Sequence, residues 1–122
     1  MRQIQADSAP AAIGPYSHAY EAGGLVLTSG QIGLNPATGA LEEGITAQAK
    51  MACENVARVL AAAGTSPEKV VKTTCFLADM ADFQAFNEVF ADYFPSKPAR
   101  SCVAVRALPA GALCEIEAIA EK

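Results

Sequence analysis

The sequence predicts an α+β domain in which two helices cover one face of a mainly antiparallel or mixed β-sheet. Three observations predict this fold class. Apolar residues are spaced as in strands in some segments and as in helices in others, and the segments follow in the order ββ(β)αβαββ. The length of 122 residues suits one domain. No internal repeat or low-complexity linker divides residues 1–122.

The first part of the chain is expected to contribute short strands. Residues 1–16 read as irregular, because prolines and a glycine interrupt them. Two β-prone runs follow at 17–21 and 25–29, and the Ala-Gly-Gly sequence between them predicts a hairpin. A turn cluster rich in Pro and Gly occupies 35–39 and ends this part.

The middle of the chain predicts two helices with a strand between them. Residues 46–63 place apolar side chains three and four positions apart, which is typical of an amphipathic helix, and Gly64 ends it. Residues 70–78 are rich in β-branched side chains and predict a central strand. Residues 81–93 carry an aromatic stripe at helical spacing, which we interpret as core packing.

Two last strands are predicted over 101–107 and 113–120, joined by a loop that contains Pro109 and Gly111. A hairpin of these strands would place arginine and glutamate side chains on neighbouring strands. Because the loop length does not fix the register, the pattern leaves open which side chains face each other.

The composition predicts a partner for part of the surface. The chain is 52% apolar and 18% charged, whereas an ordinary soluble domain is about 25% charged. A single small core cannot bury so much apolar side chain, so we expect a second copy of the chain to cover some of it. The formal net charge of −4 and the lack of a basic run argue against nucleic-acid binding.

No signal peptide or membrane-spanning segment is recognisable, which predicts a cytoplasmic protein. The four cysteines show no C-x-x-C spacing, and His18 is the only histidine, so we expect no metal site. Cys53 in a helical pattern and Cys75 in a strand pattern are interpreted as buried free thiols in a reducing compartment.

Charged residues inside the two last apolar strands are the first candidates for chemistry. Arg100 is suited to binding a small carboxylate, because its planar guanidinium donates two parallel hydrogen bonds. A partly buried Glu115 is suited to proton exchange with a water molecule, because burial raises the pKa of a carboxyl group. Cys102 shares the face of Arg100. From the pattern alone, an exposed Arg–Glu cross-strand pair is the simpler explanation.

The N-terminal elements offer a second set of candidates. Tyr16 ends a rigid Gly-Pro loop with an aromatic side chain that has a polar tip. Ser29 and Gly30 stand at a strand end, where a missing side chain lets a ligand approach the backbone. Each is weak alone, since Tyr16 fits a packing role and Gly30 fits a β-bulge.

The segments "APAAIGPYS", "LTSGQIGLNPATG", "VVKTTCFLADMADFQAFNEVF", "PARSCVAV" and "LPAGALCEIEAIA" together closely resemble the Rid family, also called the YjgF family. The matches run from about Ala9 to Ala120 and are closest to the archetypal reactive intermediate deaminases. The resemblance implies a chorismate-mutase-like fold with two helices on one face of the sheet. It also implies a homotrimer with a barrel-like centre and ligand sites between neighbouring subunits.

The resemblance further implies hydrolysis of reactive 2-imino and 2-enamino acids, such as 2-aminoacrylate and 2-iminobutyrate, to 2-oxo acids and ammonia. Dehydratases that use pyridoxal phosphate release these compounds, and the hydrolysis itself needs no cofactor or metal. Arg100 matches the residue that grips the substrate carboxylate, and Glu115 matches the residue that positions or activates water. Cys102 matches a pocket residue that is not a covalent nucleophile. The remaining matched ligand contacts are Tyr16, Ser29, Gly30 and Asn87.

One departure is at the pocket rim, where His18 stands in place of the common glutamine. Two rival functions stay open at this point. Ribonuclease activity or inhibition of translation has been ascribed to relatives, although the acidic balance argues against it. A non-catalytic module that binds small acids, or acts as a chaperone through its apolar surface, is the other.

Overall fold

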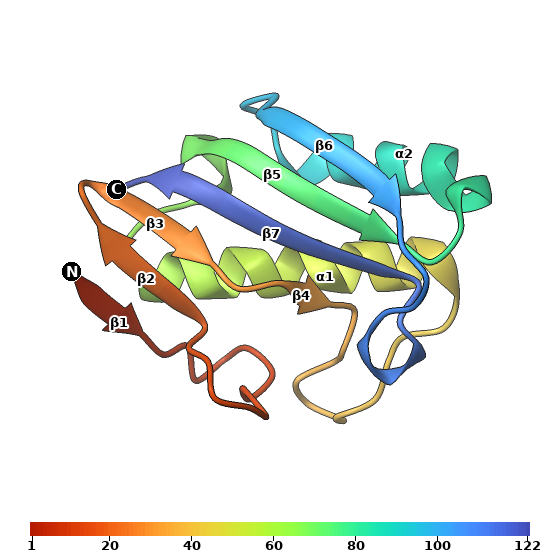
Figure 1. Cartoon of the computed structure of the whole chain (residues 1–122), viewed down its shortest axis with the longest axis horizontal. Coiled ribbons are helices and arrows are strands. Elements are labelled where there is room, and N and C mark those ends of the chain that lie inside the picture. The colour runs from red at the N-terminus through yellow and green to blue at the C-terminus, as the bar shows by residue number, and fades with distance from the viewer.

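The computed structural model describes residues 1–122 and shows one sheet of seven strands with two helices packed on the same face (Figure 1). The strands are β1 (Arg2–Ile4), β2 (Ala19–Ala22), β3 (Leu25–Thr28), β4 (Gln31–Ile32), β5 (Val70–Leu77), β6 (Ala99–Ala104) and β7 (Cys114–Glu121). The helices are α1 (Gly44–Ala62) and α2 (Phe83–Tyr93), with single 3-10 turns η1 (Pro67–Lys69), η2 (Met80–Asp82) and η3 (Pro109–Gly111). The predicted α+β class and the two helices on one face are confirmed.

The strands lie in the order β1-β2-β3-β7-β5-β6, and β4 also pairs with β7. Strands β5 and β6 are parallel and all other pairs are antiparallel, so the sheet is mixed. The hairpin predicted for the two last strands is wrong, because β5 is inserted between β6 and β7. The hairpin of β2 and β3 is confirmed, and both of its turn glycines, Gly23 and Gly24, have positive φ angles.

Residues 1–16 are not wholly irregular, since β1 forms the edge of the sheet beside β2. Ile4 pairs with Ala19, and both side chains are buried. A strand of three residues is too short to show an alternating pattern. The strand is held by pairing with β2, whose residue Ala19 lies opposite Ile4 although it is distant along the chain. A local sequence pattern cannot show such a pairing.

The core lies between the sheet and the two helices. Along β7, Cys114, Ile116, Ala118 and Ala120 face the helices and are buried, whereas the side chains between them point to the other face. The apolar stripes of both helices complete this core, so the interpretation of the aromatic stripe over 81–93 as core packing is confirmed. The opposite face of the sheet carries no helix in Figure 1, and we call it the open face.

Helix α1 holds β4 and the beginning of β7 in place. Gly33 allows the approach, since a Cβ atom there would lie 2.5 Å from the carbonyl oxygen of Gln48. The Asn55 side chain donates to the carbonyls of Ile32 and Leu34, at 3.0 and 2.8 Å. The Gln48 side chain accepts from the amide of Leu113 at 2.8 Å. These contacts fix the segments on either side of Glu115.

Three of the four cysteines, Cys53, Cys75 and Cys114, are buried free thiols, as predicted for the first two. Burial raises the pKa of both Cys75 and Cys114 to about 12, so these thiols stay protonated at neutral pH. No three side chains among His, Cys, Asp and Glu are grouped so that they could hold a metal ion. Neither helix has the length and apolar character that crossing a membrane requires.

Candidate active site

Arg100 lies on the helix-covered face of the sheet. In the strand pairing it is opposite Thr73 of β5, which in turn is opposite Ala118 of β7, and both of these side chains are buried in the core. Arg100 is half-buried at the edge of that core. Its guanidinium carbon is 4.9 Å from the centre of the Phe90 ring and 5.6 Å from that of Phe83. Helix α2 therefore holds the cation against two aromatic rings.

One guanidinium nitrogen of Arg100 is bound to protein and the others are free. Nη1 donates to Oδ1 of Asn87 at 2.8 Å, and the remaining N–H groups have no protein acceptor. A hollow of about 330 Å³, the Arg100 hollow, is lined by Asn87, Phe90, Ala91, Phe94, Pro95, Lys97, Pro98 and Arg100. A planar cation with spare donors at the wall of a hollow is suited to binding a carboxylate.

Glu115 lies on the open face, opposite to the face that carries Arg100. Its neighbours Cys114 and Ile116 are in the core, so strand alternation points Glu115 the other way. Strand β5 also separates the two residues within the sheet. No ion pair joins Arg100 to Glu115. The exposed cross-strand pair that the sequence pattern favoured is therefore wrong for this chain.

A cavity of about 470 Å³, the Glu115 cavity, adjoins the Glu115 carboxylate. The N-terminal segment, the stretch from β3 through β4 and the loop before β7 form its walls. Its lining residues are Pro10, Ala11, Ile13, Tyr16, His18, Ser29, Gly30, Gln31, Ile32, Leu34, Pro109, Ala110 and Glu115. The structure thus brings together Tyr16, Ser29, Gly30 and Glu115, and places Asn87 and Arg100 in the other hollow.

Gly30 lets the Glu115 carboxylate lie directly against the main chain. A Cβ atom at position 30 would overlap Oε1 of Glu115 and would lie 2.8 Å from its Cδ. The glycine is therefore required by close approach, because its φ angle is not in the positive range that favours glycine. The β-bulge interpretation of Gly30 also agrees with the register, because Leu27 pairs with Ile119 and Gln31 with Ile116, which leaves one extra residue opposite β7.

The environment of Glu115 favours its protonated form. Burial raises the pKa of the Glu115 carboxyl above its ordinary value, and the negative charge of Glu117 raises it further. A raised carboxyl pKa brings proton uptake and release closer to neutral pH. Such a group can act as a general base and then as a general acid in one reaction.

Cys102 lines neither hollow, although it shares the face of Arg100. Its Cα pairs with that of Cys75 in the parallel β5–β6 ladder. Burial raises the pKa of the Cys102 thiol, and the charge of Arg100 offsets only part of this effect. A thiol that remains protonated is a poor nucleophile. The structure gives Cys102 a packing position beside Arg100.

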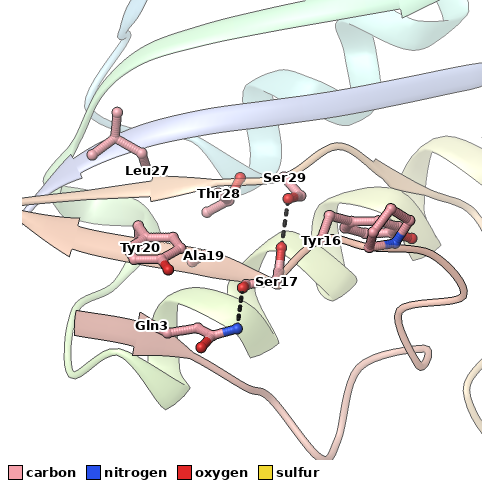
Figure 2. A pocket seen from close by; sticks show the side chains of 9 residues that line it. Gln3, Tyr16, Ser17, Ala19, Tyr20, Leu27, Thr28 and Ser29 are labelled. Atoms are coloured by element: carbon pink, nitrogen blue, oxygen red, sulfur yellow. Dashed lines mark hydrogen bonds between the residues drawn. The ribbon is translucent and has the colours of Figure 1, made fainter. Parts of the chain in front are cut away.

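A larger hollow of about 690 Å³ lies on the open face beside the Glu115 cavity (Figure 2). It is lined by Gln3, Pro15, Tyr16, Ser17, Ala19, Tyr20, Leu27, Thr28 and Ser29. It shares Tyr16 and Ser29 with the Glu115 cavity but includes no carboxylate, histidine or arginine. Size alone therefore does not identify a reaction site, because Arg100 and Glu115 line two smaller hollows.

Sequence reasoning missed several residues that shape the site. Phe83 and Phe90 hold Arg100, and the only signal was an aromatic stripe that core packing already explained. Pro109 and Ala110 reach the Glu115 cavity from the loop before β7. Ala110 has a φ of 58°, a left-handed conformation that is uncommon outside glycine and that composition cannot reveal.

Comparison with known proteins places the chain among close relatives. A family model described as endoribonuclease L-PSP matches residues 6–122. A protein of Haemophilus influenzae named RutC family protein is 49% identical over 122 residues, covering 96% of this chain and 94% of that protein. A Mus musculus protein named 2-iminobutanoate/2-iminopropanoate deaminase is 49% identical over 119 residues, covering 96% of this chain and 88% of that protein.

A solved structure of Escherichia coli TdcF with bound serine is similar over the whole fold. The TM-score is 0.94 at 41% sequence identity, and the match covers 100% of this chain and 99% of that one. The likeness therefore includes the sheet, both helices and the segments that form both hollows.

Proposed function

The chain belongs to the YjgF/Rid family, whose family model carries the description endoribonuclease L-PSP, and we propose that it hydrolyses reactive 2-imino and 2-enamino acids to 2-oxo acids and ammonia. The relatives from mouse and Salmonella typhimurium that carry the deaminase name support this assignment. TdcF with bound serine supports a small amino-acid-like ligand.

The state of Arg100 is the observation that carries the proposal. The two aromatic rings of α2 and Asn87 fix the guanidinium, yet several of its N–H groups have no protein partner. An arginine kept only for stability would be expected to use these donors within the chain. A substrate with a carboxylate next to a C=N bond satisfies them and leaves its reactive carbon beside the cation.

The reaction needs only water, one proton carrier and positioning. Glu115 takes a proton from a water molecule as the water oxygen bonds to C2 of the imine. The carboxyl group then gives that proton to the nitrogen, which has received the electron pair of the C=N bond, and a carbinolamine results. Glu115 next takes the hydroxyl proton of this carbinolamine and passes it to the amino nitrogen, so that the C–N bond breaks and ammonia leaves as the C=O bond forms. The raised pKa of Glu115 suits both steps. No metal or cofactor enters this scheme.

We extend the proposal to the assembly, because Arg100 and Glu115 lie on opposite faces of one chain. A substrate of a few ångströms cannot contact both residues within a single chain. A homotrimer in which the Arg100 hollow of one subunit meets the Glu115 cavity of the next would complete each site from two chains. In this arrangement the Arg100 hollow of one subunit and the Glu115 cavity of the next form a single site.

The open face of the sheet supports the trimer proposal. Tyr20, Leu25, Leu27 and Val103 are large apolar side chains on this face, with exposed fractions between 37% and 46%. Large apolar side chains exposed on one face often mark a surface that another protein covers. Three open faces packed around a common axis would cover them and form a barrel-like centre.

A coupled assay tests the proposed activity. A serine or threonine dehydratase generates the imine in a buffer without nucleophilic amines, and its decay is followed by absorbance with and without the protein. We expect the protein to accelerate the decay and to release 2-oxo acid and ammonia in equal amounts. Ligand binding without acceleration would replace the proposal by a binding module. Cleavage of RNA in place of imine turnover would favour the ribonuclease rival.

Mixed trimers test whether each site uses two chains. Arg100→Ala and Glu115→Gln chains are each expected to be inactive as pure trimers. After denaturation together and refolding, a site that pairs intact Arg100 with intact Glu115 forms in about one quarter of random pairings. We therefore expect the mixture to regain about one quarter of the wild-type activity. A mixture as inactive as its components, with mixing verified by mass spectrometry, would contradict sites shared between chains.

Gly30→Ala tests the contact between Gly30 and Glu115. The new methyl group forces the carboxylate aside, and misplacing a catalytic group by about 1 Å can lower the rate by up to about 100-fold. We expect a lower kcat with a nearly unchanged unfolding midpoint, because only the end of a flexible side chain must move. In a Glu115→Gln background the same change should have little further effect. A full additional loss there would mean that Gly30 acts independently of Glu115.

A further inference from the structure

His18 is a buried ionisable group that the proposed reaction does not use. It is the only histidine of the chain, and 1% of it is exposed. Its side chain lines the Glu115 cavity just before β2 begins. The family resemblance indicated only that His18 stands where glutamine is common.

Both ring nitrogens of His18 are bound to main-chain atoms of the N-terminal segment. Nδ1 accepts a hydrogen bond from the amide of Ala6 at 2.9 Å. Nε2 lies 2.8 Å from the carbonyl oxygen of Pro10, which can only accept. The pair of partners therefore fixes one tautomer, a neutral imidazole with its proton on Nε2.

The main chain that carries the imidazole is firmly anchored. The amide of Ser29 donates to the carbonyl of His18 at 2.9 Å, and the Ser29 hydroxyl donates to the carbonyl of Ser17 at 2.6 Å. Figure 2 shows this second bond, together with the bond from the Gln3 side chain to the Ser17 hydroxyl. His18 therefore links the main chain anchored beside β3 to the N-terminal segment, through its bonds to Ala6 and Pro10.

The segment that His18 holds forms one wall of the Glu115 cavity. Pro10, Ala11, Ile13 and Tyr16 line the cavity, yet Ile13 is 92% exposed and Tyr16 is 49% exposed. The stretch 11–16 thus has little packing of its own. It is supported at one end by the Pro10 carbonyl on His18 and at the other by the Ser17 contacts.

We propose that His18 is a positioning residue whose neutral imidazole holds this wall, and with it Tyr16, in place beside Glu115. The catalytic consequence rests on the proposed imine hydrolysis, whereas the structural part does not. Protonation gives Nδ1 a hydrogen, and the imidazolium can then no longer accept from the Ala6 amide. Acid therefore removes the contact with Ala6, whereas Nε2 still donates to the Pro10 carbonyl and the wall keeps this attachment.

Two other titratable side chains face the same cavity, Tyr16 on the wall itself and Glu115 on β7. Neither is hydrogen-bonded to the imidazole, whose two bonds are both to main-chain atoms. A change in the N-terminal segment that follows the protonation of His18 is therefore separable from the titration of Glu115. The Glu115→Gln variant makes that separation directly.

The single histidine makes the first test direct, since ¹⁵N-labelled protein gives only one imidazole spectrum. While the bond from Ala6 is formed, we expect the two nitrogens to report a proton on Nε2 alone. As the pH is lowered, the Ala6 amide should lose its protection from hydrogen exchange in step with protonation of the ring, also in Glu115→Gln. A ring protonated on Nδ1 would overturn the proposal. So would hydrogen-exchange protection of the Ala6 amide that does not change when the ring is protonated.

The substitutions His18→Gln and His18→Asn each keep a different one of the two hydrogen bonds of His18. Glutamine places an N–H donor where Nε2 stands and can hold the Pro10 carbonyl, whereas asparagine places an oxygen where Nδ1 stands and can hold only the Ala6 amide. Because the wall is attached through Pro10, we expect His18→Gln to stay within about threefold of wild-type kcat/KM. His18→Asn should lose about 10- to 100-fold, mainly in KM, at an unchanged unfolding midpoint.

Equal losses in both variants, or losses that only follow their stability, would show that His18 merely fills space. If the wild-type protein has no imine turnover, the proposed function fails, but the imidazole spectrum and the Ala6 exchange still decide the positioning role. The two conclusions can therefore fail separately.

Discussion

Replacing Arg100 by alanine is expected to lower kcat/KM for imine hydrolysis by about 100- to 4,000-fold. A carboxylate bound by two charge-assisted hydrogen bonds loses roughly 3–5 kcal/mol when both donors are removed, and about 1.4 kcal/mol corresponds to a factor of ten in rate. Arg100→Lys keeps the charge but not the planar pair of donors, so we expect an intermediate loss of about tenfold. The coupled dehydratase assay measures both variants.

The fold should survive these changes, because Arg100 is half-buried and its only protein hydrogen bond is to Asn87. Arg106 provides the matched control, since it is an exposed arginine just beyond β6 that lines neither hollow. Arg106→Ala removes the same charge and should keep wild-type activity. Wild-type turnover by Arg100→Ala would remove Arg100 from the site, and equal losses in both variants would point to a general effect of charge.

Much of the fold could be predicted from local patterns, and the errors arose where pairing is not local. The helix over 46–63 and the strand over 70–78 are close to α1 and β5, because side-chain spacing and Gly64 are signals within one segment. The insertion of β5 between β6 and β7 depends on contacts between segments far apart in sequence. A loop that contains Pro109 looks like a hairpin connection whether or not the strands it joins are neighbours.

The site residues could be predicted by type, but their arrangement could not. Arg100 and Glu115 stand out because charges are rare inside apolar strands. Whether they share a face depends on strand order and register, and the structure places them on opposite faces. The role of Gly30 was equally hidden, because a glycine that makes room for a neighbouring side chain has no local sequence signal.

Glu115→Gln is expected to lower kcat by at least about 100-fold, the lower end of the usual range of about 10²- to 10⁴-fold for a general acid–base group. The amide keeps the shape of the carboxyl group but can neither take a proton from water nor return one to nitrogen. In the wild type the base must be ionised, so kcat/KM should fall as the pH drops below the raised pKa of Glu115. Measuring kcat/KM against pH checks this expectation, and the fall of kcat/KM at low pH should be absent in Glu115→Gln.

Glu117→Gln provides a control for the role of Glu115. A merely structural role of Glu115 would not produce the change in pH dependence that we expect from this variant. Glu117 lies two residues further along β7 on the same face, outside the Glu115 cavity, and its charge helps to raise the pKa of Glu115. Removing that charge should shift the acid limb of the profile to lower pH and leave the maximal rate close to that of the wild type. An acid limb that stays in place would mean that Glu115 does not set it.

The free energy of unfolding gives an independent readout, because Glu115→Gln is expected to lower the rate but to raise stability at neutral pH. Because the folded-state pKa of Glu115 is raised, the folded chain binds its proton more tightly than the unfolded chain does. The resulting stability is present below the unfolded pKa and is lost as the pH rises through the folded pKa. Glu115→Gln avoids this loss, so at equal protein concentration it should match the wild type in acid and exceed it at neutral pH in urea unfolding. If Glu115→Gln were less stable than the wild type at neutral pH, the Glu115 carboxylate would stabilise the fold. That result would contradict the view that the protein keeps this acid–base group at a cost to stability.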